Sequence, residues 1–203
     1  MDDACLFGDP QAVYQAKRDI SSLFSTKDVG ELKEYVGVTV DKSNNTIGLS
    51  QPDIITRLER YFGSEVEKMR EYKAPLAAHH HVVRPEGGTS TLSREDMLKY
   101  RSGTGSLLYL VKHSRPDIGN AVQELSKVMD SATTGHMKDL LCCIRYVLLT
   151  RNKKLKYQLN ATDGIYIVAI CDSDYAGDPQ SRKSISGYIV YINGCPIAWR
   201  SRQ

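Results

Sequence analysis

The sequence predicts an α+β fold, and three observations along its 203 residues support this class. Two β-rich runs joined by a turn lie near the start, and a long stretch with helical apolar stripes occupies the middle. After about residue 155 the apolar period changes from helical to alternating, which is typical of strands. The length allows one large domain or two small ones, with a sizeable core in either case.

The first part of the chain is predicted to combine a helix with a strand hairpin. The apolar side chains of residues 11–24 fall on one stripe, as on an amphipathic helix. Residues 31–41 and 46–49 are rich in β-forming side chains, and Ser43-Asn44-Asn45 between them favours a turn. We therefore expect helix, strand, turn and strand in this order.

A second helix is predicted to follow directly. Ser50 is suited to cap it, and Pro52 is favourable in its first turn. Residues 63–92 show no regular period and are predicted to form a loop or linker. The expected buried stripe of the helix consists of Ile54, Ile55, Leu58, Tyr61 and Phe62.

The linker contains three consecutive histidines, His79, His80 and His81. Histidine is a common metal ligand, but sequence neighbours point in different directions on a helix or strand. A metal site would therefore need further ligands from elsewhere in the chain. We expect no physiological metal site at these residues.

Helices are predicted over residues 94–113, from about Pro116 onward, and over residues 136–150. Their apolar residues recur at helical spacing, so each helix should bury one face in a shared core. The second and third helices contribute Ile118, Ala121, Val122, Leu125, Val128, Met129, Leu140, Leu141, Ile144, Val147 and Leu148 to this prediction.

The last part of the chain is predicted to be rich in strands. Residues 165–171 form a nearly continuous apolar run, which is typical of a strand buried on both faces. Asn193-Gly194 lies between predicted strands 186–192 and 196–200 and is the strongest hairpin signal in the chain. A domain boundary is expected near residue 160, where turn-forming residues coincide with the change of period.

Composition and charge leave several classes of partner open. The chain is 41% hydrophobic and 25% charged, and its net charge of +3 permits nucleic-acid binding without demanding it. Five scattered cysteines without a Cys-x-x-Cys pair argue against disulfides and zinc, so we expect reduced core thiols. No apolar run could span a bilayer and no signal peptide is evident. We expect an intracellular protein, cytoplasmic or nuclear, with no membrane partner.

Two groups of carboxylates are candidates for metal chemistry. Asp2 and Asp3 lie at the start of the chain, and Asp172, Asp174 and Asp178 follow the apolar run 165–171. Mg²⁺ prefers oxygen ligands, and two ions held by carboxylates stabilise the attacking and leaving oxygens of a phosphodiester displacement. Acids at strand ends and chain termini are also commonly solvated surface groups, so the pattern by itself leaves both readings open.

Short sequence motifs along the chain resemble the motifs of one protein family and occur in the same order. Residues 28–33 with 37–38 resemble "DLGELKYFLGI", and residues 49–51 match "LSQ". Further along, the chain resembles "YRSLVGSLLYL" at 100–110, "TRPDI" at 114–118, "SDADWAGD" at 172–178 and "RKSTSGY" at 182–188. Through these motifs together, the chain resembles copia-type (Pseudoviridae-like) retrotransposon Pol polyproteins over essentially its whole length.

This resemblance implies the C-terminal part of a reverse transcriptase followed by the start of an RNase H domain. It implies the end of the palm, a partial hairpin, over residues 1–50 and a thumb-like part over 51–112. Connection-like helices would cover 113–160. The first strands of a truncated RNase H-like mixed sheet would lie within 161–203.

The resemblance also implies roles for three carboxylates. Asp2 and Asp3 would be the second half of the polymerase motif "YVDD", and Asp172 would be the first carboxylate of the RNase H site, with Asp174 the less suitable candidate. In the family these catalytic residues hold Mg²⁺ or Mn²⁺. The other acids of both sites fall outside this sequence, so we expect an inactive fragment that binds no metal stably.

The thumb and connection of the family cradle a template–primer duplex, either an RNA–DNA hybrid or DNA. The candidate contacts to its phosphates are Arg57, Arg60, Arg151, Lys153 and Lys154. Such contacts would be independent of sequence and strongly dependent on salt. The alternative is that these residues are solvated charges interspersed with acids.

Three functional hypotheses follow. The chain is a fragment of a transposon polymerase whose partner is the rest of the Pol polyprotein, a non-catalytic nucleic-acid-binding remnant, or an interaction protein that only inherits the fold. We also expect Tyr188 to Ile192 to form an unpaired or uncovered apolar edge, which would favour association of residues 160–203.

Overall fold

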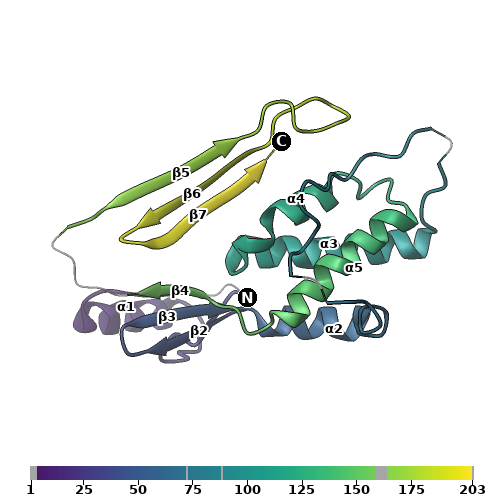
Figure 1. Cartoon of the computed structure of the whole chain (residues 1–203). Helices are drawn as coiled ribbons and strands as arrows, with labels where there is room; N and C mark the ends of the chain where they lie inside the picture. The colour runs from purple at the N-terminus through teal and green to yellow at the C-terminus, as the bar shows by residue number, and fades with distance from the viewer. Residues whose placement is uncertain (1–3, 72, 88, 159–163, 203) are drawn as a thin grey trace.

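The computed structural model describes residues 4–71, 73–87, 89–158 and 164–202. Within these residues the chain forms helices and two antiparallel sheets, which confirms the α+β class. In Figure 1 the first sheet lies beside the helices, and the second sheet lies above the first.

Helix α1 (Pro10–Leu23) confirms the first predicted helix. The carboxylate of Asp9 caps it by accepting hydrogen bonds from the backbone N–H groups of Gln11 and Ala12 at 2.9 and 3.2 Å. None of its residues is buried, so its apolar stripe has little packing to stabilise it.

The first sheet consists of β1 (Glu34–Tyr35), β2 (Val38–Ser43), β3 (Thr46–Ser50) and β4 (Leu155–Gln158), in the order β1-β2-β3-β4. The predicted turn between β2 and β3 is confirmed, and Asn44 there has a φ of 46°. Strand β4 enters the sheet after the helical middle and pairs with β3. The first sheet is therefore completed by residues more than a hundred positions from its hairpin.

Helix α2 (Pro52–Val66) follows β3 and buries Ile55, Leu58, Phe62 and Val66. Two details of the sequence prediction were wrong. Ser50 is the last residue of β3, because the strand continues one residue further than expected, and Gln51 occupies the N-cap position without a capping side-chain bond. Tyr61 is 60% exposed, since it lies at the edge of the buried stripe.

The helical middle contains α3 (Arg94–His113), the 3-10 turn η1 (Pro116–Ile118), α4 (Gly119–Ser126) and α5 (Thr134–Leu149). The three predicted helices are confirmed, with a 3-10 turn at the start of the second. Together with α2 they enclose the main apolar core. Its fully buried members include Leu107, Leu110, Ile118, Val122, Leu125, Val128, Leu140, Ile144 and Val147.

Gly103 of α3 packs closely against two neighbouring helices of this core. A Cβ atom at this position would lie 2.9 Å from the Phe62 ring of α2 and 3.0 Å from Leu140 Cδ2 of α5. Gly105, on the same helix, has no neighbouring atom within 4 Å of an added Cβ. The two glycines of α3 therefore differ in packing while sharing the same helical backbone.

The second sheet consists of β5 (Ile167–Ser173), β6 (Ser186–Ile192) and β7 (Cys195–Arg202), in the order β5-β6-β7. The predicted hairpin at Asn193-Gly194 is confirmed, with φ angles of 49° and 78°. Both positive values suit a two-residue turn that matches the twist of the strands. The predicted boundary near residue 160 lies outside the described residues, and the division into domains stays a prediction.

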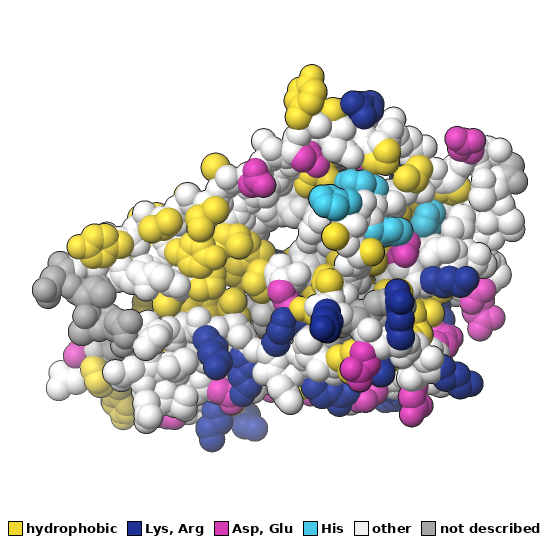
Figure 2. Space-filling view, in the orientation of Figure 1, with side chains coloured by type: hydrophobic (Ala, Val, Ile, Leu, Met, Phe, Trp, Pro, Cys, Tyr) yellow, Lys and Arg dark blue, Asp and Glu magenta, His cyan; other side chains and the backbone are white. Residues whose placement is uncertain are grey.

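Two expectations about burial in the second sheet were wrong. Every residue of β5 is exposed, because β5 is an edge strand with one partner and no described element covers its faces. The edge that was expected to be unpaired or uncovered, Tyr188 to Ile192, belongs to β6, which is the central strand and pairs on both sides, and of these residues only Tyr188 is exposed. Figure 2 shows apolar side chains gathered over this sheet. The exposed apolar strand is therefore β5.

The five cysteines occupy different environments, and none forms a disulfide. Only Cys143 is buried, and burial raises the pKa of its thiol to about 12. The expectation of core thiols is thus confirmed for Cys143 alone. Among the described helices none combines the length and the apolar character required to cross a bilayer.

The two glycines of α3 provide a matched test of core packing. Gly105→Ala should raise the free energy of unfolding by up to about 1 kcal/mol, because alanine favours a helix. Gly103→Ala should lower it by roughly 1 to 2 kcal/mol, because overpacking against Phe62 and Leu140 outweighs that gain. Urea unfolding measures both values. Equal stability of the two variants would contradict the packing described for α3.

Candidate functional site

A groove of about 960 Å³ separates the second sheet from the helical middle. One wall is formed by the ends of β5 and β6 with residues of β7, and the other by α4 and the end of α3. Asp172 and Asp174 line the sheet side, and Lys112 lies on the helix side. The groove is thus the place where the predicted RNase H carboxylate meets the helices.

Asp172 lies near the end of β5, where its backbone pairs with Gly187 of β6, and its side chain is exposed. Asp174, two residues further on, lines the same groove. Within the ranges described, no three His, Cys, Asp or Glu residues form a group that could hold a metal ion. Asp2 and Asp3 lie outside the described residues.

Asp174 is engaged in closing the connection between β5 and β6. Its carboxylate accepts a hydrogen bond from the backbone N–H of Ile185 at 2.5 Å, and its own N–H donates to the Ile185 carbonyl at 3.1 Å. A side chain at Gly177 would collide with this carboxylate. The absence of a side chain at Gly177, within the motif Ala176-Gly177-Asp178, therefore leaves room for the Asp174 carboxylate.

Asp178 is 5% exposed and forms an ion pair at 2.8 Å with Lys127, the C-cap residue of α4. Its other carboxylate oxygen accepts hydrogen bonds from the backbone N–H groups of Gln180 and Ser181, at 3.2 and 2.6 Å, and from the Ser181 hydroxyl at 2.8 Å. Lys127 also lies 2.6 Å from a carboxylate oxygen of Glu124, which is 1% exposed. One ammonium group thus neutralises two buried carboxylates.

The electrostatics of this group follow from burial and charge. Burial alone would raise the pKa of Asp178, but the hydrogen bonds from Lys127 and Ser181 outweigh it and hold the pKa well below its usual range. Burial would lower the pKa of Lys127, but its bonds to Asp178 and Glu124 raise it. Asp178 and Lys127 are therefore both charged at neutral pH, and the Asp178 carboxylate is fully engaged with protein donors.

The two predicted phosphate-contacting residues of α2 are available to solvent. Arg57 and Arg60 are exposed and lie one helical turn apart. Arg60 lies over the ring of Tyr61, with its guanidinium carbon 5.5 Å from the ring centroid. Neither arginine makes an ion pair with any acidic side chain in the described part of the chain.

The three predicted contacts that follow α5 each have an acidic partner. Arg151 forms an ion pair with Glu59 at 2.5 Å, and Lys154 pairs with Asp41 at 2.5 Å. Lys153 lies 3.4 Å from Asp117 and donates a hydrogen bond to the Tyr146 hydroxyl at 2.8 Å. Figure 2 shows Lys and Arg interspersed with acidic side chains along the lower side of the molecule. This arrangement favours the alternative of neutralised surface charges for these three residues.

A buried polar cluster centred on Arg115 was missed by the sequence analysis. Arg115 is 2% exposed and makes a bidentate contact to Asp117 at 2.8 and 3.0 Å. It also donates to the Thr150 hydroxyl at 2.7 Å, and its guanidinium lies over the Tyr146 ring. The Tyr146 hydroxyl in turn donates to Asp117 at 3.1 Å. The sequence motif at residues 114–118 includes Arg115 and Asp117, but nothing in it indicated that the Arg115 side chain is buried.

Asp117 remains ionised in this cluster. Burial would raise the pKa of its carboxyl, but the hydrogen bonds and charge of Arg115, with Lys153 and Tyr146, lower it below the ordinary value. The pKa of Lys153 is raised, first by its hydrogen bond with Tyr146. The charges of the cluster are thus compensated within it, since Arg115 and Lys153 both lie beside the Asp117 carboxylate.

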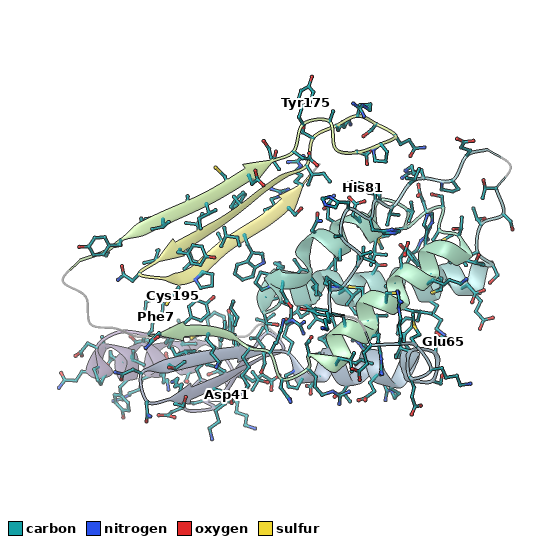
Figure 3. All side chains as sticks on the ribbon, viewed as in Figure 1. Phe7, Asp41, Glu65, His81, Tyr175 and Cys195 are labelled. Atoms are coloured by element: carbon teal, nitrogen blue, oxygen red, sulfur yellow. The ribbon has the colours of Figure 1, made fainter. Side chains whose placement is uncertain are left out.

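The consecutive histidines lie in the loop that borders the groove. Figure 3 shows His81 on the side of the helices that faces the second sheet. His80 pairs with Asp139 at 3.0 Å, and His81 Nδ1 lies 3.9 Å from Glu124. Nearby His136 uses Nδ1 to accept the Thr133 N–H at the start of α5. These contacts hold the loop against α4 and α5.

Comparisons with known proteins find that the chain is similar to transposon proteins. It is 29% identical to the retrovirus-related Pol polyprotein from transposon TNT 1-94 of Nicotiana tabacum, over 100% of this chain and 15% of that protein. It is 31% identical to the Pol polyprotein from transposon RE1 of Arabidopsis thaliana, over 100% of this chain and 13% of that protein. A putative transposon Ty5-1 protein of Saccharomyces cerevisiae is 26% identical, over 96% of this chain and 61% of its own length.

No family model and no solved structure matches the chain. The chain spans about an eighth to three fifths of the length of these relatives. The matches nevertheless run through essentially all of its residues, in plant and yeast proteins alike. Retrovirus-related Pol polyproteins of copia-type transposons are therefore homologues of this chain over its full length.

Proposed function

We propose that the chain forms the junction between the reverse transcriptase and RNase H parts of a Pol polyprotein. We further propose that these 203 residues by themselves have neither activity. The observation that carries the proposal is that Pol polyprotein relatives match 96% to 100% of the chain. The sequence motifs at residues 28–33, 100–110 and 172–178 then suggest that it is the part that joins the reverse transcriptase to the RNase H domain.

The order of the structural elements supports this assignment. A sheet hairpin comes first, helices α2 to α5 follow, and a separate antiparallel sheet ends with the exposed Asp172 near the tip of its first strand. This is the order expected for the end of a palm, a thumb and connection, and the first strands of an RNase H-like domain. Strand β4 makes the helical part continuous with the first sheet, as a junction requires.

The described carboxylates do not fit a metal site of the kind that polymerase and RNase H chemistry uses with Mg²⁺ or Mn²⁺. Asp172 is the only acid of its motif whose carboxylate has no contact to a protein donor in the part of the chain that is described. Asp174 accepts the Ile185 N–H, and Asp178 pairs with Lys127. A two-metal mechanism needs several converging carboxylates, so we propose that the isolated chain holds no catalytic ion.

The purified 203-residue chain should neither extend a primer nor cleave the RNA strand of a hybrid. The reason is that a lone carboxylate supplies too little of the charge that two metal ions need. The measurement is product formation with Mg²⁺ or Mn²⁺, compared with a matched control variant, which is Asp2→Asn combined with Asp3→Asn for primer extension and Asp172→Asn for hybrid cleavage. Product from the wild type that disappears in the variant would overturn the proposed inactivity.

We also propose that α2 contributes contacts to the backbone of a nucleic-acid duplex. Arg57 and Arg60 lie one turn apart, are exposed and have no acidic partner among the described residues. Free cations of this kind can replace counterions on phosphates. Arg151, Lys153 and Lys154 would first have to leave their acidic partners, so their share in such binding should be smaller.

A salt titration distinguishes these two groups of cations. Arg57→Gln combined with Arg60→Gln should flatten the dependence of log K on log [salt] by about 2 for an RNA–DNA hybrid, because each lost phosphate contact removes about 0.9. Lys153→Gln combined with Lys154→Gln is the matched control and should change the slope by less than about 1. Fluorescence anisotropy with a labelled hybrid measures both slopes. An unchanged slope in the arginine variant would exclude α2 as the contact surface.

A further inference from the structure

The connection between β5 and β6 reaches back across the groove to the helices. Its two ends, Asp174 and Ile185, line the groove and are joined by the two hydrogen bonds described above. Figure 3 shows Tyr175 on this connection, with its ring pointing away from the molecule, and it is 96% exposed. The connection is therefore a protruding segment with a narrow neck at the groove.

Two contacts fix the far part of this segment, one to the end of α4 and one to the loop that precedes α3. The first is the ion pair between Asp178 and Lys127, whose side chains are 7% and 11% exposed. The second is a pair of hydrogen bonds between the Gln180 side chain and the backbone of Arg84, at 3.1 and 3.3 Å. The Gln180 contacts are exposed, so the buried ion pair is expected to be the stronger of the two.

The segment has a backbone that needs such fixing. Ala176 and Arg182 have φ angles of 50° and 56°, in a region that side chains other than glycine rarely adopt. Asp178 stabilises the tight turn between them, since its carboxylate accepts the N–H groups of Gln180 and Ser181 and its carbonyl accepts that of Arg182. One residue thus both shapes the segment and attaches it.

We propose that residues 174–185 form a lid at the groove and that the ion pair between Lys127 and Asp178 is its latch. Glu124 completes the latch by holding the Lys127 ammonium from the other side, at 2.6 Å. Glu124 also accepts the Val82 N–H at 2.8 Å, so the latch connects α4, the histidine loop and the lid. Opening would release the segment whose two ends, Asp174 and Ile185, line the groove, and would leave the Lys127 ammonium without its Asp178 partner.

Limited proteolysis of the full chain tests the latch, because Arg182 and Lys183 are exposed trypsin sites within the lid. Asp178→Asn keeps a side-chain oxygen for the turn but removes the charge that holds Lys127. Cleavage after Arg182 or Lys183 should become about tenfold faster, since cleavage follows the population of the open segment. Hydrogen exchange of the Asp178 and Arg182 amides should accelerate with it, while exchange in α5 stays unchanged.

Two controls keep the result specific. Lys154→Gln breaks an ion pair on the first sheet and should leave cleavage in the lid unchanged. Wild type and Asp178→Asn chains unfolded in urea should be cleaved at equal rates, which excludes an effect on trypsin itself. Lys127→Gln provides a second variant that should also release the lid. Cleavage of folded Asp178→Asn and Lys127→Gln chains at the wild-type rate would overturn the proposal.

Discussion

The buried guanidinium of Arg115 is the constraint on which the middle of this molecule depends. A charged group with 2% exposure is stable only when nearly every donor has a partner. Asp117 satisfies two donors, and Thr150, at the end of α5, satisfies others. Arg115 therefore fixes the end of α5 beside η1.

This fixed point determines how the first sheet is completed. The chain leaves α5 at Thr150 and enters β4 at Leu155, so the position of Thr150 limits where β4 can begin. Strand β4 then pairs with β3, from Leu49 opposite Leu155 to Thr46 opposite Gln158. The helical core and the hairpin near the start of the chain thus become one structure through a short connection.

The second sheet is attached in a different way. Its strands bury little apolar surface, and β5 is exposed throughout, so hydrophobic contacts alone hold it weakly. Polar contacts supplement them: the Trp199 indole donates to the Val111 carbonyl at 2.7 Å, and Asp178 pairs with Lys127. Of these contact residues, Trp199 and Val111 line the groove between the sheet and the helices.

Periodicity was sufficient to predict most elements of the fold. The stripes of α2 to α5 and the Asn193-Gly194 turn are local signals, and the structure confirms them. The burial of β5 was predicted wrongly, because an apolar run gives no information on whether other elements cover it. Local sequence could place the hairpin but not the sheet partner β4, which arrives from far along the chain.

In the candidate site, too, local sequence did not reveal partners that lie far along the chain. Arg151, Lys153 and Lys154 formed a basic run, but their partners Glu59, Asp117 and Asp41 lie 92, 36 and 113 positions away. The motif around Asp172 was recognisable in the sequence. The ion-pair partner of Asp178, Lys127 at the end of α4, was not. Exposed charges such as Arg57 and Arg60 were predicted more reliably, since they depend only on the face of one helix.

The role of Arg115 is tested most directly by the free energies of unfolding of two arginine variants, measured in urea. Arg115→Met should lower the free energy of unfolding by roughly 2 to 3 kcal/mol, because it leaves Asp117 and the Thr150 oxygens without their buried donor. Arg151→Met removes an ion pair that is nearly half exposed and should cost less than about 1 kcal/mol. Equal losses in the two variants would contradict the central role of Arg115.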